Sequence, residues 1–257
     1  MVAEAHRVEP KTLNHVTLSR RFLRHVRRVW DVLRWRGPVP FFCLTMREAF
    51  RPLFYWYAYY IIRNEIFPPS AARRPATSEL DIVVRHGEEG LERTKVELIG
   101  MDDLTAEEID ARFGRGDAVA VAYAGDRAVG YAWMSFNSGQ KLTFDIAWAV
   151  HPGEAVLHDT FVVPAWRGRR IPTRLDTALN DFAHQHGITY AYSSIAILNK
   201  QALRILTLRG KTRILTLFLL RVRGINRTWR VVRGDSTFDA HFQKLEPSTH
   251  TTGERAK

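Results

Sequence analysis

The strongest constraint on the fold is the stretch of residues 156–186, where a strand, a turn and a helix follow one another closely. Val156 to Val163 is rich in apolar and β-branched residues, and Pro164 ends the strand that this run predicts. Arg170 to His186 then carries apolar residues at helical spacing, and Gly187 follows as a residue that readily ends a helix. The basic sequence "RGRR" joins the strand to the helix.

The junction between this strand and helix has the chemistry of an anion-binding site. The first amides of a helix lack intrahelical partners, and the helix dipole adds partial positive charge at the same end. Arg167, Arg169 and Arg170 add formal charge, while Gly168 lets the backbone approach a ligand closely. The stretch therefore predicts a site for a phosphate-bearing ligand, and the alternative is a basic, solvated surface turn.

The rest of the body alternates between short strands and helices. Thr105 can cap one helix, because Glu108 follows three residues later as a capping-box partner. The order of elements predicts an α/β (α+β) domain over residues 80–245, with a mixed, mostly antiparallel sheet flanked by helices. Helices are expected at residues 103–113, 170–186 and 200–208, and strands at residues 80–84, 95–99, 118–124, 128–136, 142–150, 156–163, 188–198, 214–223 and 228–232.

A basic, aromatic-rich helical extension is expected over residues 1–67. Residues 1–74 hold 14 Lys and Arg against 5 Asp and Glu, and so carry most of the net charge of +11. Within residues 17–36 an apolar stripe lies opposite an arginine-rich face. Such a helix packs on the body or on the second subunit of a homodimer, or it contacts an anionic membrane surface. Specific nucleic-acid binding is not expected, because no reader motif accompanies the charge.

The aromatic run "FYWYAYY" at residues 54–60 suits either a strand or a buried helix, and periodicity does not separate the two. It would cover the body or line a pocket for a long acyl chain. Residues 68–79 are expected to be a linker, and residues 246–257 a flexible tail.

The cellular compartment is bounded by what the sequence lacks. A single cysteine, Cys43, excludes an internal disulfide and fits a reducing compartment. We find no secretory signal, and no apolar run of the about 20 residues that cross a membrane as a helix. A cytoplasmic location is expected, with peripheral contact to the inner membrane surface through residues 17–36 as the alternative.

The histidines show no metal-ligand spacing, so no metal is expected.

The sequence "HDTFVVPAWRGRRIPTRL" resembles the pyrophosphate-binding segment of the GCN5-related N-acetyltransferase (GNAT) superfamily, and the order of elements over residues 95–233 resembles that family's fold. Val163 and Pro164 match the end of the family's strand, and Asn199 matches an asparagine of its next segment. The family's loop and its apolar anchor are matched by Arg167, Gly168, Arg169 and Ile171. Two departures are Arg170, in place of a second glycine, and Pro172, in place of a small residue.

The resemblance implies an N-acyltransferase that uses an acyl-CoA, with acetyl-CoA as the expected donor, and a small-molecule or protein amine as acceptor. The main chain of Phe161 and Val163 would bind the pantetheine arm of coenzyme A. The loop with Arg170 would bind the pyrophosphate, and Asn199 would reach the cofactor from the next strand. The variable loops at residues 100–116, 136–142 and 223–228 would form the acceptor site.

The resemblance also places a general base on the strand before the loop, where His158 and Asp159 stand. Adjacent residues of a strand face opposite sides, so we expect only one of the two to point into the cleft. Glu154 is a looser candidate. The family's usual thiolate acid is a tyrosine, but Leu206 occupies that position, and Tyr190 and Tyr192 remain as substitutes or as core residues. Two alternatives stay open: a catalytically silent CoA-binding protein, and a long-chain N-acyltransferase at a membrane surface.

Overall fold

The computed structural model of the chain describes Met46, Phe50 and residues 53–68, 80–88, 91–99, 101–102, 104–143, 146–199, 202–203, 211–222 and 228–245. The expected helices at 17–36 and 200–208, the linker, the tail and Cys43 lie wholly or mostly outside these residues. Within them, no helix is long and apolar enough to cross a membrane.

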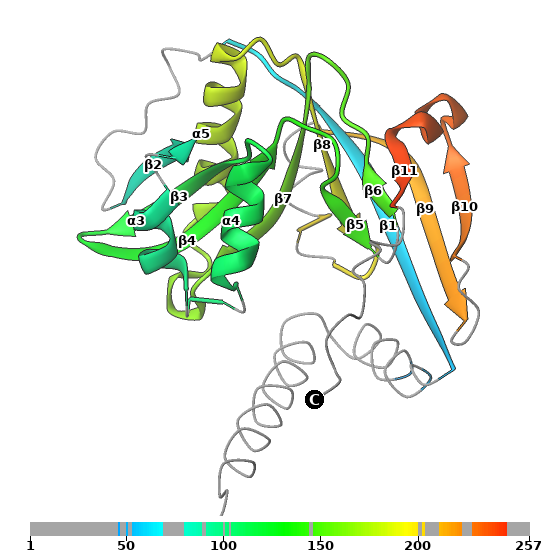
Figure 1. The fold of residues 1–257 in the computed structure, drawn as a ribbon, viewed down its shortest axis with the longest axis horizontal. Coiled ribbons are helices and arrows are strands. Elements are labelled where there is room, and N and C mark those ends of the chain that lie inside the picture. The colour runs from blue at the N-terminus through cyan, green and yellow to red at the C-terminus, as the bar shows by residue number, and fades with distance from the viewer. Residues whose placement is uncertain are drawn as a thin grey trace, which may run out of the picture.

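An eight-stranded sheet dominates the fold, in the order β10-β9-β1-β8-β7-β4-β3-β2 (Figure 1). All neighbouring strands in it are antiparallel except β7 and β8, which pair in parallel. A second sheet has the order β11-β6-β5. The strands are β1 (Phe54–Glu65), β2 (Asp81–His86), β3 (Ala118–Ala124), β4 (Arg127–Ser135), β5 (Lys141–Thr143), β6 (Ile146–Trp148), β7 (Glu154–Val162), β8 (Tyr190–Ala196), β9 (Thr212–Val222), β10 (Thr228–Gly234) and β11 (Phe242–Lys244).

Helices cover both faces of the sheet at its β2–β4 end, because the side chains of β3 and β4 alternate between two cores. Ala120 and Met134 belong to the core beneath α5 (Ile171–Gln185). Val121 and Trp133 belong to the core beneath α3 (Leu91–Leu98) and α4 (Ala106–Gly114). The mixed, mostly antiparallel sheet flanked by helices is therefore confirmed.

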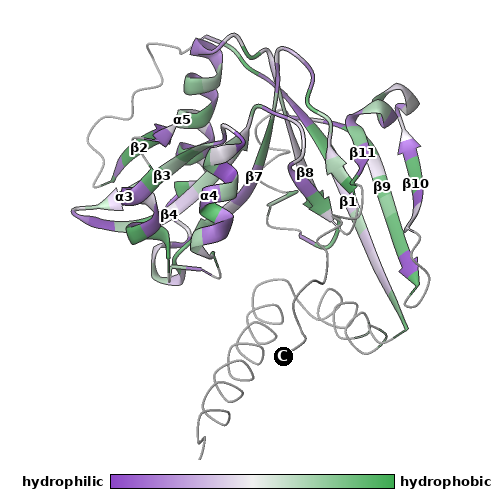
Figure 2. Cartoon of the chain, viewed as in Figure 1, coloured by the Kyte–Doolittle hydropathy of each residue, from purple (hydrophilic) through white to green (hydrophobic). Residues whose placement is uncertain are grey.

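Helix α5 buries one face against the sheet, as its apolar spacing predicted, and Figure 2 shows hydrophobic and hydrophilic residues alternating along it. Ile171, Leu175 and Leu179 are almost completely buried there. Ile171 approaches Gly130 of β4 so closely that a Cβ on this glycine would lie 3.3 Å from Ile171 Cγ2 and 2.9 Å from the carbonyl oxygen of Phe161. Only glycine fits without a shift of the backbone.

The aromatic run of residues 54–60 is a strand and continues to Glu65 as β1. This strand lies between β8 and β9 and pairs antiparallel with both (Figure 1). Its residue Ile61 is fully buried. The sequence placed the boundary between the N-terminal extension and the body after residue 67, but residues 54–65 already belong to the sheet of the body. Strand propensity and a buried central position together favour the extended conformation over a helix.

Several local expectations are confirmed and others are wrong. Helix α4 has the expected capping box between Thr105 and Glu108. Residues 95–99, expected to be a strand, lie mainly in α3, where Glu97 pairs with Arg93 one turn earlier and with Arg85 of β2. The expected strand at residues 142–150 is instead split between β5 and β6, and β11 was not foreseen.

Candidate active site

Strands β7 and β8 part along their length. Their parallel pairing joins Glu154–Val156 to Tyr190–Tyr192 only, although β7 continues to Val162 and β8 to Ala196. On the side away from the gap, β7 pairs with β4 and β8 pairs with β1. Beyond Val156 the main-chain groups of β7 and β8 do not pair with each other, so a ligand between the strands can bind those that no other group engages.

A β-bulge in β7 brings His158 and Asp159 to the same cavity. Between the pairs Tyr131–Phe161 and Trp133–His158, β4 has one residue and β7 has two. Asp159 is the extra residue, with a positive φ of 47°. The expectation that only one of the two side chains faces the cleft is therefore wrong, because the bulge interrupts the alternation on which it rested.

The cavity has a volume of about 420 Å³ and lies where the two strands part. His158 and Asp159 line it from β7, and Ser194 lines it from β8, beyond the last paired residue. Helix α4 and the hairpin of β5 and β6 close its other sides. The remaining lining residues are Asp102, Leu104, Glu108, Arg112, Tyr131, Gln140, Lys141, Leu142 and Trp148.

His158 is held by a buried polar network. Its Nε2 lies 3.0 Å from Ser135 Oγ and 3.7 Å from Oδ2 of the fully buried Asp117, whose charge is paired with Arg115 at 2.6 Å. Burial lowers the pKa of His158 from its usual value, although Asp117 acts in the opposite direction. The imidazole is therefore neutral near pH 7, and its Nδ1 has no hydrogen-bond partner among the described residues.

Asp159 pairs with Arg112 of α4, whose Nη1 lies 2.6 Å from Asp159 Oδ2. The guanidinium also lies over the ring of Trp133, 4.9 Å from its centroid. About a third of the Asp159 side chain remains exposed. This carboxylate is thus fixed in position while still open to a ligand in the cavity.

A tyrosine that we did not predict, Tyr131 of β4, lines the cavity with its hydroxyl donating to Asp102 at 3.3 Å. Burial, with Asp159 and Asp102 nearby, raises the pKa of Tyr131, so the phenol keeps its proton. Tyr190 and Tyr192, which the sequence left as either substitutes for the family's tyrosine or core residues, do not line this cavity, and Tyr192 is buried in the core. Tyr192 donates to Glu154 instead, and Glu154 itself lies outside the cavity.

The loop between β7 and α5 presents main-chain groups. Arg170 is the N-cap residue of α5, and no side chain of the described residues caps this helix end. Gly168 and Arg170 both have positive φ, at 86° and 58°. A turn with such angles aims successive amides at one point, which suits an anion. Arg170 therefore adopts the conformation that a glycine, the family's residue here, would adopt without strain.

The arginine side chains of the loop are partly engaged within the protein. Arg167 Nε donates to the carbonyl oxygen of Val162 at 3.2 Å, and Arg169 lies 4.4 Å above the ring of Trp166. Both residues remain exposed, as does Arg170. Positive charge therefore surrounds the amides without covering them.

The expected main-chain role of Phe161 and Val163 conflicts with the strand pairing. The amide of Val163 donates to the carbonyl of Val129, on the side of β4. Main-chain groups alternate in direction along a strand, so those of Phe161 face β4 as well, and those of Thr160 and Val162 face the gap toward β8.

Two other expected residues have structural contacts. Ile171 is buried beneath the loop and anchors it to the sheet. Asn199 follows β8, and its side-chain oxygen accepts from the amide of Ala202 at 3.3 Å, as a helix-capping residue does. Ile171 follows β7 and Asn199 follows β8, so both residues come after the carboxyl ends of the two parallel strands.

Comparison with known families assigns the region that contains this site. Residues 88–210 match the model of the acetyltransferase (GNAT) family. They therefore form a GNAT acetyltransferase domain, as the resemblance predicted. A comparison with curated proteins finds no match.

Solved structures with a similar fold share little sequence with the chain. One is a Drosophila protein, at 12% identity and a TM-score of 0.44, covering 70% of this chain and 57% of that one. Another is a tandem GNAT protein of clavulanic acid biosynthesis, at 16% identity and a TM-score of 0.46, covering 66% of this chain and 54% of that one. A third is an aminoglycoside N-acetyltransferase in complex with CoA, at 18% identity and a TM-score of 0.39, covering 53% of this chain and 90% of that one. The chain thus spans little more than half of the first two, and the family assignment rests on the family model.

Proposed function

We propose that this protein is an acyl-CoA-dependent N-acyltransferase that transfers an acetyl group from acetyl-CoA to a small amine. The observation that carries the proposal is the parting of β7 and β8 after Val156 and Tyr192. An uncapped helix end stands at one end of the gap, and a cavity with titratable side chains stands beside it. If an acyl-CoA bound along the gap, the end of α5 would bind its phosphates, and the side chains of the cavity would lie beside its thioester carbon.

The loop would hold the pyrophosphate mainly through main-chain amides. Gly168 and Arg170 have the backbone angles of an anion-binding turn, and the dipole of α5 adds partial positive charge. Pro172 lacks an amide but lies in the first turn of the helix, where that loss is tolerated. The main chain of Thr160 and the amide of Val162 would bind the pantetheine arm in place of a paired strand, while the carbonyl of Val162 accepts from Arg167 Nε.

The chemistry requires a neutral amine at the thioester carbonyl carbon. As the new C–N bond forms and the C–S bond breaks, the nitrogen loses a proton and the thiolate gains one. Asp159 is the expected base, because its carboxylate is fixed by Arg112 and partly exposed to the cavity. His158, neutral and in the same cavity, is the second candidate. Tyr131 is a protonated group in the same cavity that could donate a proton to the thiolate of coenzyme A.

The cavity favours a small cationic acceptor. Its volume of about 420 Å³ falls in the range typical of small-molecule sites. Asp102, Glu108 and Asp159 contribute carboxylates, against the two cations Arg112 and Lys141. Trp148 adds an aromatic face on which an ammonium or an apolar chain could pack.

The test is the release of free thiol from acetyl-CoA in the presence of a panel of small diamines, polyamines and aminosugars. The proposal expects release that depends on the amine and is lost in Asp159→Asn. A second candidate is a silent CoA-binding protein, favoured by Leu206 at the family's tyrosine position. Binding of CoA by calorimetry without amine-dependent release would support that alternative and reject the enzyme.

The preferred chain length is tested in two ways. Acetyl-, butanoyl-, octanoyl- and palmitoyl-CoA are compared in thermal-shift measurements, because a ligand of the folded state raises the melting temperature. The same donors are then compared in the thiol-release assay. Short chains are expected to give turnover, and a preference for palmitoyl-CoA would instead support the long-chain alternative.

A further inference from the structure

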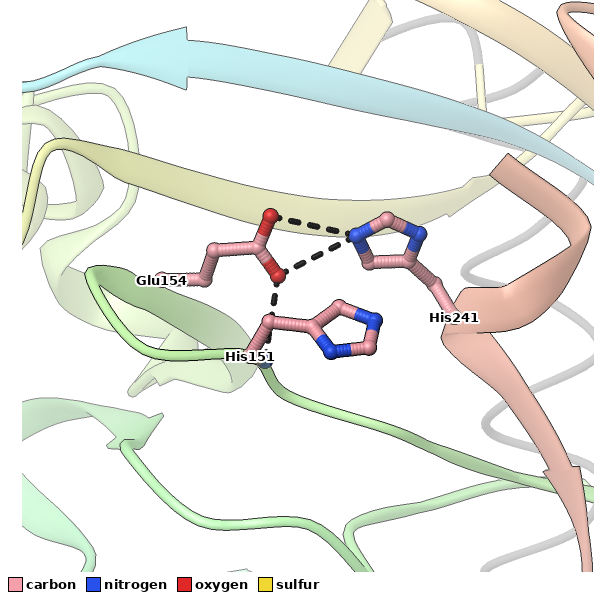
Figure 3. A group of neighbouring side chains, drawn as sticks. All are labelled: His151, Glu154 and His241. Atoms are coloured by element: carbon pink, nitrogen blue, oxygen red, sulfur yellow. Dashed lines mark hydrogen bonds and ion pairs between the residues drawn. The ribbon is translucent and has the colours of Figure 1, made fainter. Parts of the chain in front are cut away.

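A second group of titratable side chains lies outside the cavity, at the start of β7. His151, Glu154 and His241 converge there, as Figure 3 shows. His151 and Glu154 are the ends of the turn His151-Pro152-Gly153-Glu154, in which the amide of Glu154 donates to the carbonyl of His151 at 3.0 Å. Gly153 has the positive φ of 81° that such a turn needs after proline. His241 comes from the far end of the chain, just before β11.

The distances match those of metal ligands. His241 Nε2 lies 3.1 Å from both carboxylate oxygens of Glu154, and one ligand atom from each of the three residues lies within 4.8 Å of the others. Two ligand atoms at zinc distances from one tetrahedral ion stand about 3.3 Å apart. The rings of His151 and His241 are 4.7 Å apart and nearly perpendicular. Glu154 and His241 thus already have the required spacing, and only the exposed His151 must turn.

Hydrogen bonds hold the carboxylate of Glu154 in place as the outer shell of a metal site does, whereas His241 is held by a ring contact and its Nδ1 has no hydrogen-bond partner among the described residues. The hydroxyl of Tyr192 donates to Glu154 Oε1 at 3.0 Å, and the amide of His151 donates to Oε2 at 3.2 Å. The ring of His241 stacks on Phe238 at 3.8 Å, with an interplanar angle of 7°. The carboxylate and one imidazole are therefore oriented before any ion binds.

We propose that His151, Glu154 and His241 bind one divalent transition-metal ion, and that zinc is the ion the donor set fits best. Two imidazole nitrogens and one carboxylate oxygen are zinc ligands, and a water would complete the tetrahedron on the exposed side of His151. Magnesium and calcium are disfavoured, because they require oxygen donors. No metal was expected from the sequence, where Glu154 and His241 stand 87 positions apart.

The site would act as a cross-link. None of its three residues lines the cavity, so the ion has no contact with the proposed reaction. It would join the turn that begins β7 to the segment Ser236–Lys244, whose Phe238 and Phe242 pack around Trp148. Trp148 also lines the cavity, so the ion would stabilise one wall of it.

His151→Ala separates a metal site from a simple ion pair. The substitution keeps the amide that donates to Glu154 and leaves the Glu154–His241 pair intact, while it removes one metal ligand. His184→Ala, a histidine of α5 outside the cluster, is the matched control. The full-length chain, without a histidine tag and freed of metal with a chelator, is titrated with zinc by calorimetry and by thermal denaturation. Magnesium serves as the control ion.

The wild type and His184→Ala are expected to bind one zinc ion at this site and to gain about 5 to 10 °C in melting temperature at zinc concentrations hundredfold above Kd. His151→Ala should weaken zinc binding at least tenfold and lose this gain, with little change in the metal-free melting temperature. Glu154→Gln should lose it as well. Zinc binding that is absent from the wild type, or unchanged in both His151→Ala and Glu154→Gln, would overturn the proposal and leave an ion pair.

Discussion

The two ends of the gap between β7 and β8 are built in different ways. At the α5 end, the groups offered to a ligand are main-chain amides around Gly168 and Arg170, and they come from one continuous segment. At the cavity end, the groups are side chains from α4, β4, β5, β7 and β8, and several are buried and paired with one another. The α5 end is exposed and formed by one segment of the chain, whereas the cavity end is partly enclosed and formed by residues far apart in the sequence.

This difference predicts different responses to mutation. Main-chain amides cannot be removed by substitution, so changes at the loop should weaken binding of the donor without abolishing it. The cavity depends on individual carboxylates and rings, so single changes there should affect the reaction strongly. If the loop proved as sensitive as the cavity, the contrast between main-chain and side-chain binding would be wrong.

The largest effect is expected for Asp159→Asn. The substitution keeps the size of the side chain but removes the base, so kcat/KM should fall by about 10² to 10⁴. Binding of acetyl-CoA, measured by calorimetry, should stay within about twofold. Asp126→Asn, in the exposed turn between β3 and β4, is the control and should leave both quantities unchanged. If Asp159→Asn kept full activity, Asp159 would not be the base, and His158 or solvent would have to accept the proton.

A smaller effect is expected for the double variant Arg167→Ala with Arg169→Ala. Each lost charge-assisted contact to phosphate is worth about 1.5–3 kcal/mol when fully formed, but Arg167 and Arg169 are exposed and partly engaged elsewhere. We therefore expect about tenfold weaker acetyl-CoA binding by calorimetry, with kcat nearly unchanged. Arg127→Ala is the control for a general loss of charge. Undiminished binding would show that the side chains of Arg167 and Arg169 do not contact the phosphates.

Much of the loop could be predicted from the sequence, because its contributors are neighbours in the chain. Proline, glycine and the helical spacing after Ile171 mark its limits, and only the register of the main chain on β7 was misjudged. The positive φ of Arg170 could be expected only from the resemblance, since the residue itself gives no such signal.

The cavity could be predicted only in part. His158 and Asp159 were identified by their position on β7, but the bulge that turns both into one cavity depends on the pairing with β4. Arg112 and Tyr131 reach Asp159 and Asp102 from other elements, and their sequence context is that of ordinary helix and strand residues. Three-dimensional pairing, which no local pattern contains, decides their roles.

A pH effect on stability should follow from His158. Burial keeps its pKa in the folded protein below the unfolded value of about 6.5, so below that pH the unfolded chain binds a proton that the folded protein does not. The free energy of unfolding should therefore fall as the pH decreases from about 6.5 toward the folded pKa, by up to about 1.4 kcal/mol per pH unit. Urea denaturation between pH 5 and 8 measures this. His158→Gln should flatten the profile, and an unchanged slope would assign it to other groups.

The smallest effects concern the backbone of the loop and should have opposite signs. Arg170→Gly removes a side chain from a left-handed residue and should stabilise the protein by up to about 1 kcal/mol, while Gly168→Ala should destabilise it by about 1–2 kcal/mol. A Cβ on Gly168 meets no atom within 4 Å, so the cost there is conformational rather than steric. Thermal denaturation measures both, and equal signs would contradict the loop conformation.

The most direct test of the central claim is a crystal structure of the protein with coenzyme A. We expect the pyrophosphate within hydrogen-bond distance of the amides of residues 168–171, and the pantetheine arm along Thr160 and Val162. The thiol should lie beside the cavity that Asp159 and Ser194 line. Coenzyme A bound elsewhere, with the gap between β7 and β8 closed or empty, would contradict the proposed function.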